Sequence, residues 1–355
     1  MISVAVLLLP AVFVQDSSAA TDSVRRSRFT ALPVVSYSDV TGLQYGAAIF
    51  HRFRVGADPL TRGSWVSAYF ARTAKEHSKA YVQLDRWSPR NETRSRIRVE
   101  YLSYPLPYFG LGADTPDSLE EWYSSGVGAV QVFTERVLRD GVYAHAGARY
   151  LRSRMRETEP GRALAGSAPG SSGSDVLATE LGLVLDSRDN AGAPRTGTYA
   201  RFMPSIAAKA IGSDFAFRRL TIDARRYGTF GTNHVVAAQL QYDGVSGDTP
   251  FDQMPMIGAD TAMRGYARGR YRDRHAFTAQ AEARSAFWRR VGVVAFAGAG
   301  TVAPSFSKLT SGSWYPTTGA GLRYLLSPRD RTVARLDLGI GRGSVGITVG
   351  IGETF

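Results

Sequence analysis

Apolar and polar residues alternate along most of this chain, and clusters of Gly, Pro, Asp and Ser separate the alternating stretches. Within residues 235–243, for example, Gln241 and Asp243 fall on one side of an extended segment, opposite Leu240 and Tyr242. A period of two predicts β-strands, and we find no segment with the 3.6-residue period of a helix. The chain is therefore predicted to be all-β, without a linker between domains.

Sixteen segments carry this pattern, with soft boundaries. They lie at approximately residues 32–37, 42–53, 63–75, 77–88, 94–104, 121–138, 141–155, 175–187, 197–208, 214–230, 233–243, 274–288, 290–302, 315–326, 330–341 and 343–355.

Two all-β architectures fit such segments. In a soluble sandwich the apolar face forms the core, whereas in a transmembrane barrel it meets lipid and the polar face lines the lumen. Many segments have the nine to eleven or more residues that a tilted strand needs to cross a bilayer, and charges such as Arg219, Asp223 and Arg225 recur in mid-strand. Aromatic residues such as Trp87 and Trp122 gather near strand ends, as in an interfacial girdle. We predict one transmembrane barrel of sixteen antiparallel strands.

The composition of the chain limits the kinds of partner that it is expected to bind. The chain has 355 residues, no Cys and a formal net charge of +12. The lack of Cys excludes disulfides and thiolate metal sites, and no nucleic-acid-binding motif is present, so no nucleic-acid partner is expected. The wall arginines either bias the lumen toward anions or pair with inward carboxylates, and we favour pairing. These arginines are Arg94, Arg96, Arg98, Arg219, Arg225 and Arg335, and the carboxylates are Glu100, Asp223, Glu282 and Asp337.

The first twenty residues read as a secretory signal. The apolar run Val4–Val14 is too short to span a bilayer as a helix, and the small residues after it suggest cleavage near Ala19 or Ala20. The predicted division is a signal peptide at 1–20, a short segment at 21–31 and the barrel at 32–355. Export and a barrel together predict a location in the bacterial outer membrane.

Between the eleventh and twelfth segments lies an unusually long connection, Met254–Arg274, with the sequence MPMIGADTAMRGYARGRYRDR. Loops of this length in compact folds are functional or disordered. Its many large residues, five arginines among them, favour function.

Three stretches resemble one family, the BamA/TamA-type bacterial surface-antigen barrels. Leu185–Tyr199 is similar to the family's segment between strands eight and nine, and Tyr108–Thr115 to a stretch found in some members. Met263-Arg264-Gly265-Tyr266 resembles the hallmark (Val/Ile)-Arg-Gly-(Phe/Tyr) motif of the same long loop. The terminal aromatic Phe355, after an alternating last strand, resembles the signal that such barrels present to their assembly machinery.

The resemblance implies that the loop folds back into the lumen. Arg264 would contact acidic residues of the wall, Gly265 would permit a tight tip, and Tyr266 would stack or hydrogen-bond against the wall. Met263 is the apolar first residue of the motif.

The wall partner of Arg264 is left open. In the family, strand thirteen often carries Phe-x-Asp-x-Gly, but here Gly298 replaces the aspartate. Glu282 lies at the matching position on strand twelve and is the first candidate partner, and Asp337 on strand fifteen is the second.

Other chemistry is less marked. Asp186, Arg188, Asp189 and Asn190 form either a cation site or, as we favour, a network of turn hydrogen bonds. Because no Gly-x-Ser-x-Gly or His-Glu-x-x-His motif occurs, we expect no enzyme, metal or cofactor, and a lipid hydrolase in the lumen ranks last.

The predicted function is a role in outer-membrane biogenesis, inserting or transporting proteins or lipids. Outer-membrane lipid or lipopolysaccharide and a periplasmic or membrane protein are the expected partners. Family insertases carry POTRA modules before the barrel, and the predicted first strand leaves no room for one, which suggests a barrel-only member. The alternative is a passive or gated pore.

Overall fold

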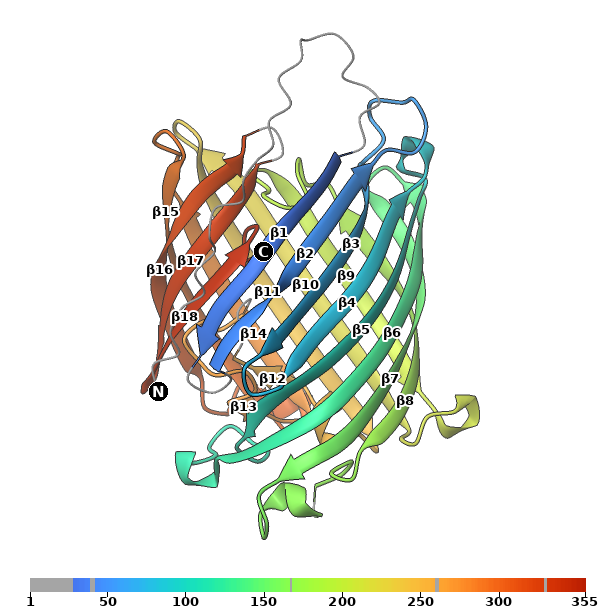
Figure 1. Cartoon of the computed structure of the whole chain (residues 1–355), viewed down its shortest axis with the longest axis vertical. Coiled ribbons are helices and arrows are strands. Elements are labelled where there is room, and N and C mark those ends of the chain that lie inside the picture. Colours follow the sequence, from blue (N-terminus) through green and yellow to red (C-terminus); the bar gives the residue numbers. More distant parts are fainter. Residues whose placement is uncertain (1–27, 39–41, 167, 259–261, 329–330) are drawn as a thin grey trace.

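The computed structural model is a sixteen-stranded antiparallel β-barrel (Figure 1), as the alternation predicts. It describes residues 28–38, 42–166, 168–258, 262–328 and 331–355. Each wall strand pairs with the next along the chain, except that β12 and β13 form a separate two-stranded sheet.

The wall strands are β1 (Arg28–Ser38), β2 (Gly42–Phe53), β3 (Ser64–Thr73), β4 (Ser78–Trp87), β5 (Thr93–Tyr108), β6 (Glu121–Arg139), β7 (Val142–Thr158), β8 (Ser174–Asp186), β9 (Gly197–Ala207), β10 (Phe217–Phe230), β11 (His234–Gly247), β14 (His275–Arg284), β15 (Val291–Ala303), β16 (Tyr315–Ser327), β17 (Thr332–Gly341) and β18 (Ser344–Ile351). The small sheet contains β12 (Met256–Ile257) and β13 (Tyr271–Arg272).

These bounds follow the predicted segments closely, with differences at both ends of the chain. β1 takes in residues 28–31, which the sequence assigned to a separate N-terminal segment, and β18 ends at Ile351 rather than at 355. The proposed signal peptide lies outside the described residues. The strands β12 and β13 were not predicted, because two residues are too few to show a period.

The two faces of the wall differ in chemistry. On β11, Val236 and Leu240 are 45% and 51% exposed and point outward, whereas Gln239 is buried toward the lumen. Charged side chains such as Asp223 and Arg264 also lie on the inside. An apolar outer face with a polar interior is the arrangement of a barrel in lipid. In the described part of the chain, no helix is long and apolar enough to span a membrane.

One end of the barrel, lower in Figure 1, carries the long connections. These are residues 109–120, 159–173, 208–216, 248–274 and 304–314. At the opposite end the connections are mostly shorter. The edge strands β1 and β18 lie near one another (Figure 1), and no pairing between them is found among the described residues.

The outward alternation leads to a stability prediction. We expect Leu240→Arg, in the middle of the outer face of β11, to lower the free energy of unfolding in lipid vesicles by about 2–4 kcal/mol. Leu240→Ala is the matched control, because it keeps the position apolar. Urea unfolding followed by tryptophan fluorescence measures both, and equal stability of the two variants would contradict a lipid-facing β11.

Candidate functional site

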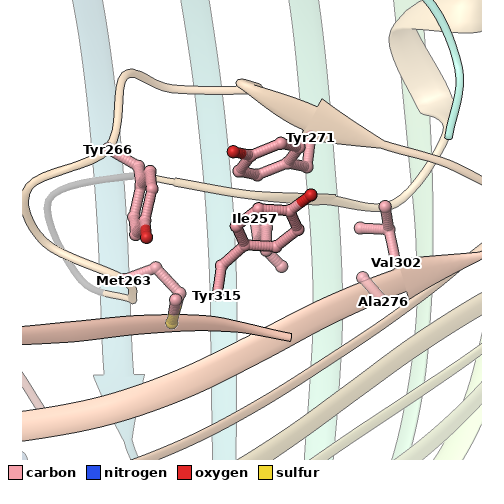
Figure 2. Close-up of a cluster of buried hydrophobic side chains, with 7 residues drawn as sticks. All are labelled: Ile257, Met263, Tyr266, Tyr271, Ala276, Val302 and Tyr315. Carbon is pink, nitrogen blue, oxygen red and sulfur yellow. The ribbon is translucent and has the colours of Figure 1, made fainter. Parts of the chain in front are cut away.

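The connection 248–274 turns back into the barrel and forms its own small core. Its strands β12 and β13 pair, with Met256 opposite Arg272 and Ile257 opposite Tyr271. Figure 2 shows how loop side chains meet wall side chains from β14, β15 and β16 in one buried cluster. The cluster contains Ile257, Met263, Tyr266, Tyr271, Ala276, Val302 and Tyr315. We call residues 248–274 the lumen loop.

Arg264 is the buried cation of this loop, with 2% of its surface exposed. One terminal nitrogen donates to Glu282 Oε1 on β14 at 2.5 Å, and the other donates to Asp337 Oδ2 on β17 at 2.9 Å. The guanidinium also lies over the Phe296 ring of β15, 3.5 Å from its centre. The structure thus brings both candidate carboxylates to Arg264, where the sequence left one partner open.

Those carboxylates are shared with further arginines of the wall. Glu282 accepts from Arg284 Nε at 3.0 Å, and Asp337 accepts from Arg323 at 2.5 Å. Arg323 also donates to Glu353 at 2.7 Å. With Arg335, which donates to Thr354, four buried arginines face three carboxylates. We call this set the arginine cage.

Glycines let the backbone of the loop lie directly on the wall. Gly265 has φ +107°, a conformation that other residues rarely adopt. A Cβ on Gly339 of β17 would lie 2.5 Å from the carbonyl carbon of Arg264, and one on Gly341 would lie 2.5 Å from the Tyr266 ring. The loop main chain therefore approaches β17 as closely as it does only because no side chain stands at these positions.

Tyr266 fixes the loop through its hydroxyl group. The hydroxyl donates to the main-chain oxygen of Pro316 at 2.8 Å and accepts from the main-chain nitrogen of Arg342 at 2.7 Å. Met263, with φ 58°, packs in the buried cluster. The whole Met263–Tyr266 motif is therefore held by wall strands β14 to β17 and by the β17–β18 turn.

The last residues after β18 turn inward instead of continuing the strand. Thr354 Oγ1 accepts from Arg264 at 3.0 Å, and the main-chain oxygen of Phe355 accepts from Arg284 at 2.8 Å. The Phe355 ring is buried with Tyr227 and Ala237 of β10 and β11. This segment closes one side of the arginine cage, and a role of Phe355 as an assembly signal stays a prediction.

The turn motif between β8 and β9 is a network of hydrogen bonds. Asp186 accepts from Arg188 and from Arg62 of the β2–β3 connection, at 2.9 and 2.8 Å. Asn190 Oδ1 accepts from the amides of Gly192 and Ala193, each at 2.9 Å. Within the described residues, no group of three or more His, Asp or Glu side chains suits a metal ion.

Asp189 joins this turn to the β16–β17 connection. Its carboxylate accepts from Arg331 and from the main-chain amides of Arg195 and Thr196. Partial burial raises the pKa of Asp189, but Arg331 and the two amides lower it by more than burial raises it. The pKa therefore lies below its usual range. The charged form therefore clamps the two connections together.

Three connections interlock at the end where the lumen loop enters. Gly112 donates its amide to the main-chain oxygen of Arg272, and Phe251 donates its amide to that of Pro169, both at 2.8 Å. Leu164 is buried with Tyr108, Tyr123 and Phe251. The Gly- and Ser-rich connection between β7 and β8 thus takes part in the packing, because Leu164 lies in an aromatic pocket. The stretch 108–115 belongs to the same closure.

Five of the six wall arginines named from the sequence pair with carboxylates, and the sixth, Arg335, donates to Thr354. Arg94 pairs with Asp85 at 2.9 Å, and Arg225 pairs with Asp223 at 2.6 Å. Arg96 pairs with Asp85, Arg98 with Glu100, and Arg219 with Asp243. These contacts support pairing rather than an anion-selective lumen.

The cage contains residues that the sequence did not single out. Arg284 and Arg323 could have been found, because alternation places Arg284 on the same face as Glu282 and Arg323 on an inward position of β16. Glu353 and Thr354 lay within the predicted last strand, where no signal announced an inward turn.

The charge balance of the cage leads to an unusual ranking of mutants. Glu282→Gln leaves Arg264 with Asp337 alone and Arg284 with Glu353 at 3.8 Å, in a cage where arginines already outnumber carboxylates, so we expect it to lower the free energy of unfolding by about 3–5 kcal/mol. Arg264→Met should cost less, because Glu282 keeps Arg284 and Asp337 keeps Arg323. Urea unfolding in vesicles gives both values, and a larger loss for Arg264→Met would contradict the ranking. Trypsin cleavage at exposed Arg268 should increase in both.

The close contact of Gly339 with the main chain of Arg264 is testable in the same assay. Gly339→Ala would press a methyl group against the main chain of Arg264, so we expect a loss of about 1–3 kcal/mol and faster cleavage of the lumen loop. Gly228→Ala is the matched control, since nothing lies within 4 Å of its Cβ position. Equal behaviour of the two alanine variants would show that the loop does not rest on β17.

Comparison with known proteins agrees with this geometry. Among solved structures, the chain is similar to BamA from Haemophilus ducreyi lacking POTRA domains 1–3, with a TM-score of 0.60 and 14% identity over 95% of this chain and 71% of that one. It is also similar to CdiB from Acinetobacter baumannii, with a TM-score of 0.52 and 11% identity over 89% of this chain and 56% of CdiB. At such identities the likeness concerns the fold.

No curated protein sequence matches the chain. The family model described as the Omp85 superfamily domain matches residues 69–355, which include the Met263–Tyr266 motif, both carboxylates that bind Arg264 and every wall strand from β4 onward. The chain therefore belongs to the Omp85 superfamily.

Proposed function

We propose that this chain acts in the bacterial outer membrane as a barrel that inserts proteins into the bilayer or moves them across it, and that it is not an enzyme. The observation that carries the proposal is the anchored lumen loop. A loop held by Glu282 and Asp337 through the buried Arg264, and joined by two further connections, lies in the space that a passive pore would leave open.

With the lumen occupied, the route for a client protein is the seam between β1 and β18. An edge strand offers unpaired main-chain groups to another strand. In the described residues β1 pairs only with β2, and β18 pairs only with β17. Gly346 and Gly350 on β18 weaken that edge further, because a strand loses side-chain packing at glycine.

The same observations speak against the alternatives. A steady pore requires an open lumen, and a hydrolase requires a base free to activate a nucleophile. The buried His145 is not such a base, because both of its ring nitrogens lie 3.2 Å from carboxylates, those of Glu135 and Glu180.

An assembly assay tests the proposal. The purified barrel in vesicles should speed the folding of an unfolded outer-membrane barrel compared with empty vesicles, measured by the heat-modifiable migration of the client. Because the chain has no Cys, a seam disulfide can be introduced by pairing Ala31→Cys in β1 with a cysteine scanned along β18. We expect the seam disulfide to stop assembly and a reductant to restore it.

The matched control is a disulfide within the paired wall. Ala200 of β9 lies directly opposite Ala224 of β10, so Ala200→Cys with Ala224→Cys should leave assembly unchanged. Folding at the rate of empty vesicles, or assembly indifferent to the seam disulfide, would overturn the proposal.

Planar bilayers separate the proposed function from a passive pore. We expect the native barrel to show no steady large conductance, and Glu282→Gln to raise the conductance by loosening the lumen loop. A steady large conductance that Arg264→Ala leaves unchanged would favour the pore. Affinity purification from native outer membrane would then test for the expected periplasmic or membrane partner.

A further inference from the structure

The outer face of the barrel has an apolar groove over β2 to β5. Its volume is about 410 Å³, within the ~300–1,000 Å³ of typical ligand sites. The groove is hollow because three of its outward residues are small, namely Ala47, Ala68 and Ala80. Five exposed hydrophobic residues are among its lining, namely Ile49, Phe70, Val82, Val99 and Tyr101.

A strip of arginines lies beside this groove on the outer face of β7. After the outward Ala146, Ala148 and Tyr150, the same face continues with Arg152, Arg154 and Arg156. The side chains of Arg152 and Arg154 are 57% and 50% exposed. Three cations at successive outward positions are unusual for a face that otherwise meets lipid.

A single carboxylate holds part of this strip in place. Asp175 of β8 accepts two hydrogen bonds from Arg152 and one from Arg154, all at 2.9 Å. Among the described residues, Arg152 and Arg154 pair with Asp175 and Arg156 donates to the Tyr101 hydroxyl, so the three guanidinium groups are oriented in advance.

Tyr101 joins the strip to the groove. Its hydroxyl accepts from Arg156 at 2.6 Å, and its ring lines the groove. Arg156 lies against β6 at Gly126, where a Cβ would be 3.1 Å from its Nε, while Gly128 leaves open space above the same strand. Glycines on β6 thus clear a passage between cations and groove.

The register and tilt of the strands set the depth of each part. A row of paired residues runs from Phe70 through Ala80, Tyr101 and Gly128 to Arg152. Because the strands are inclined to the barrel axis (Figure 1), this row descends toward the end at which the lumen loop lies. The groove therefore lies deeper in the bilayer than the arginines. The arginines follow Tyr101 and Tyr150, which lie at the level of an aromatic girdle, and so reach the surface of the bilayer.

We infer that this surface binds a phosphate-bearing lipid, with an acyl chain in the groove and the phosphate at Arg154 and Arg156. The inference rests on the proposed placement of the barrel in a membrane. Guanidinium groups match phosphate oxygens through paired, charge-assisted hydrogen bonds, and the apolar groove can pack against an acyl chain through van der Waals contacts. Neither the arginine strip nor the groove alone selects this ligand, but the two adjoin at Tyr101.

Native mass spectrometry of the detergent-purified barrel tests the inference with three probes. Phosphatidic acid has both parts of the ligand, diacylglycerol with the same chains lacks the phosphate, and inorganic phosphate lacks the chains. We expect one bound phosphatidic acid and no comparable binding of the other two.

Variants then locate the site. Arg154→Gln with Arg156→Gln should weaken phosphatidic acid binding about tenfold or more, as expected for lost charge-assisted hydrogen bonds. Ala80→Trp should do the same by filling the groove. Arg226→Gln, which removes an outward arginine on β10 near the opposite end, should leave binding unchanged. Heat-modifiable migration confirms that each variant is folded.

Equal binding of diacylglycerol or of inorganic phosphate would overturn the inference, as would full binding by either the double or the groove variant. Occupation of the groove by a second copy of the barrel, seen as a dimer that Ala80→Trp abolishes, would overturn it too. The assembly assay separates this inference from the proposed function. Loss of lipid specificity with intact assembly refutes the lipid site alone, and loss of assembly with specific lipid binding refutes the function alone.

Discussion

The structure depends on one electrostatic requirement, that a guanidinium group carried into the barrel by a loop must find negative charge there. A buried, unpaired arginine would cost several kcal/mol. Arg264 avoids this cost because β14 and β17, which are separated by two strands, both present a carboxylate at its position. Those carboxylates hold Arg284 and Arg323 in turn, so the loop is part of the wall's own charge balance rather than an addition to it.

Shape supports this requirement. The guanidinium can reach Asp337 only if the main chain of the loop lies directly against β17, and glycine at 265, 339 and 341 makes that distance possible. Phe296 supplies an aromatic face beneath the cation, a further contact that favours a desolvated guanidinium. The carboxylates, the Phe296 ring and the glycines therefore all act on the position of Arg264. The anchoring of the loop and the occupation of the lumen are two aspects of the same arrangement.

The sequence was enough to predict the barrel and most strand positions, because a strand between lipid and a wet lumen must alternate along its whole length. Alternation also placed Glu282 and Asp337 inward. It could not show that both reach Arg264, since that depends on how the wall curves and on where the loop tip stops. With Gly298 in place of the family's aspartate on β15, the second carboxylate comes from β17 instead. Leu164 and Thr354 were missed for a related reason, because each is fixed by a distant pocket or partner and not by its neighbours in sequence.

The spacing of the cage along the chain has a consequence for the order of folding. Arg264 is separated by 18, 73 and 90 residues from its partners Glu282, Asp337 and Thr354. Contacts between distant positions require a large loss of chain entropy before they form. The partner nearest in sequence can hold the loop early, whereas the last one becomes available only after β14 to β18 are in place. The arginine cage is therefore complete only after the wall has formed, and the lumen loop gains its last hydrogen bond only when the final strand of the barrel is in place.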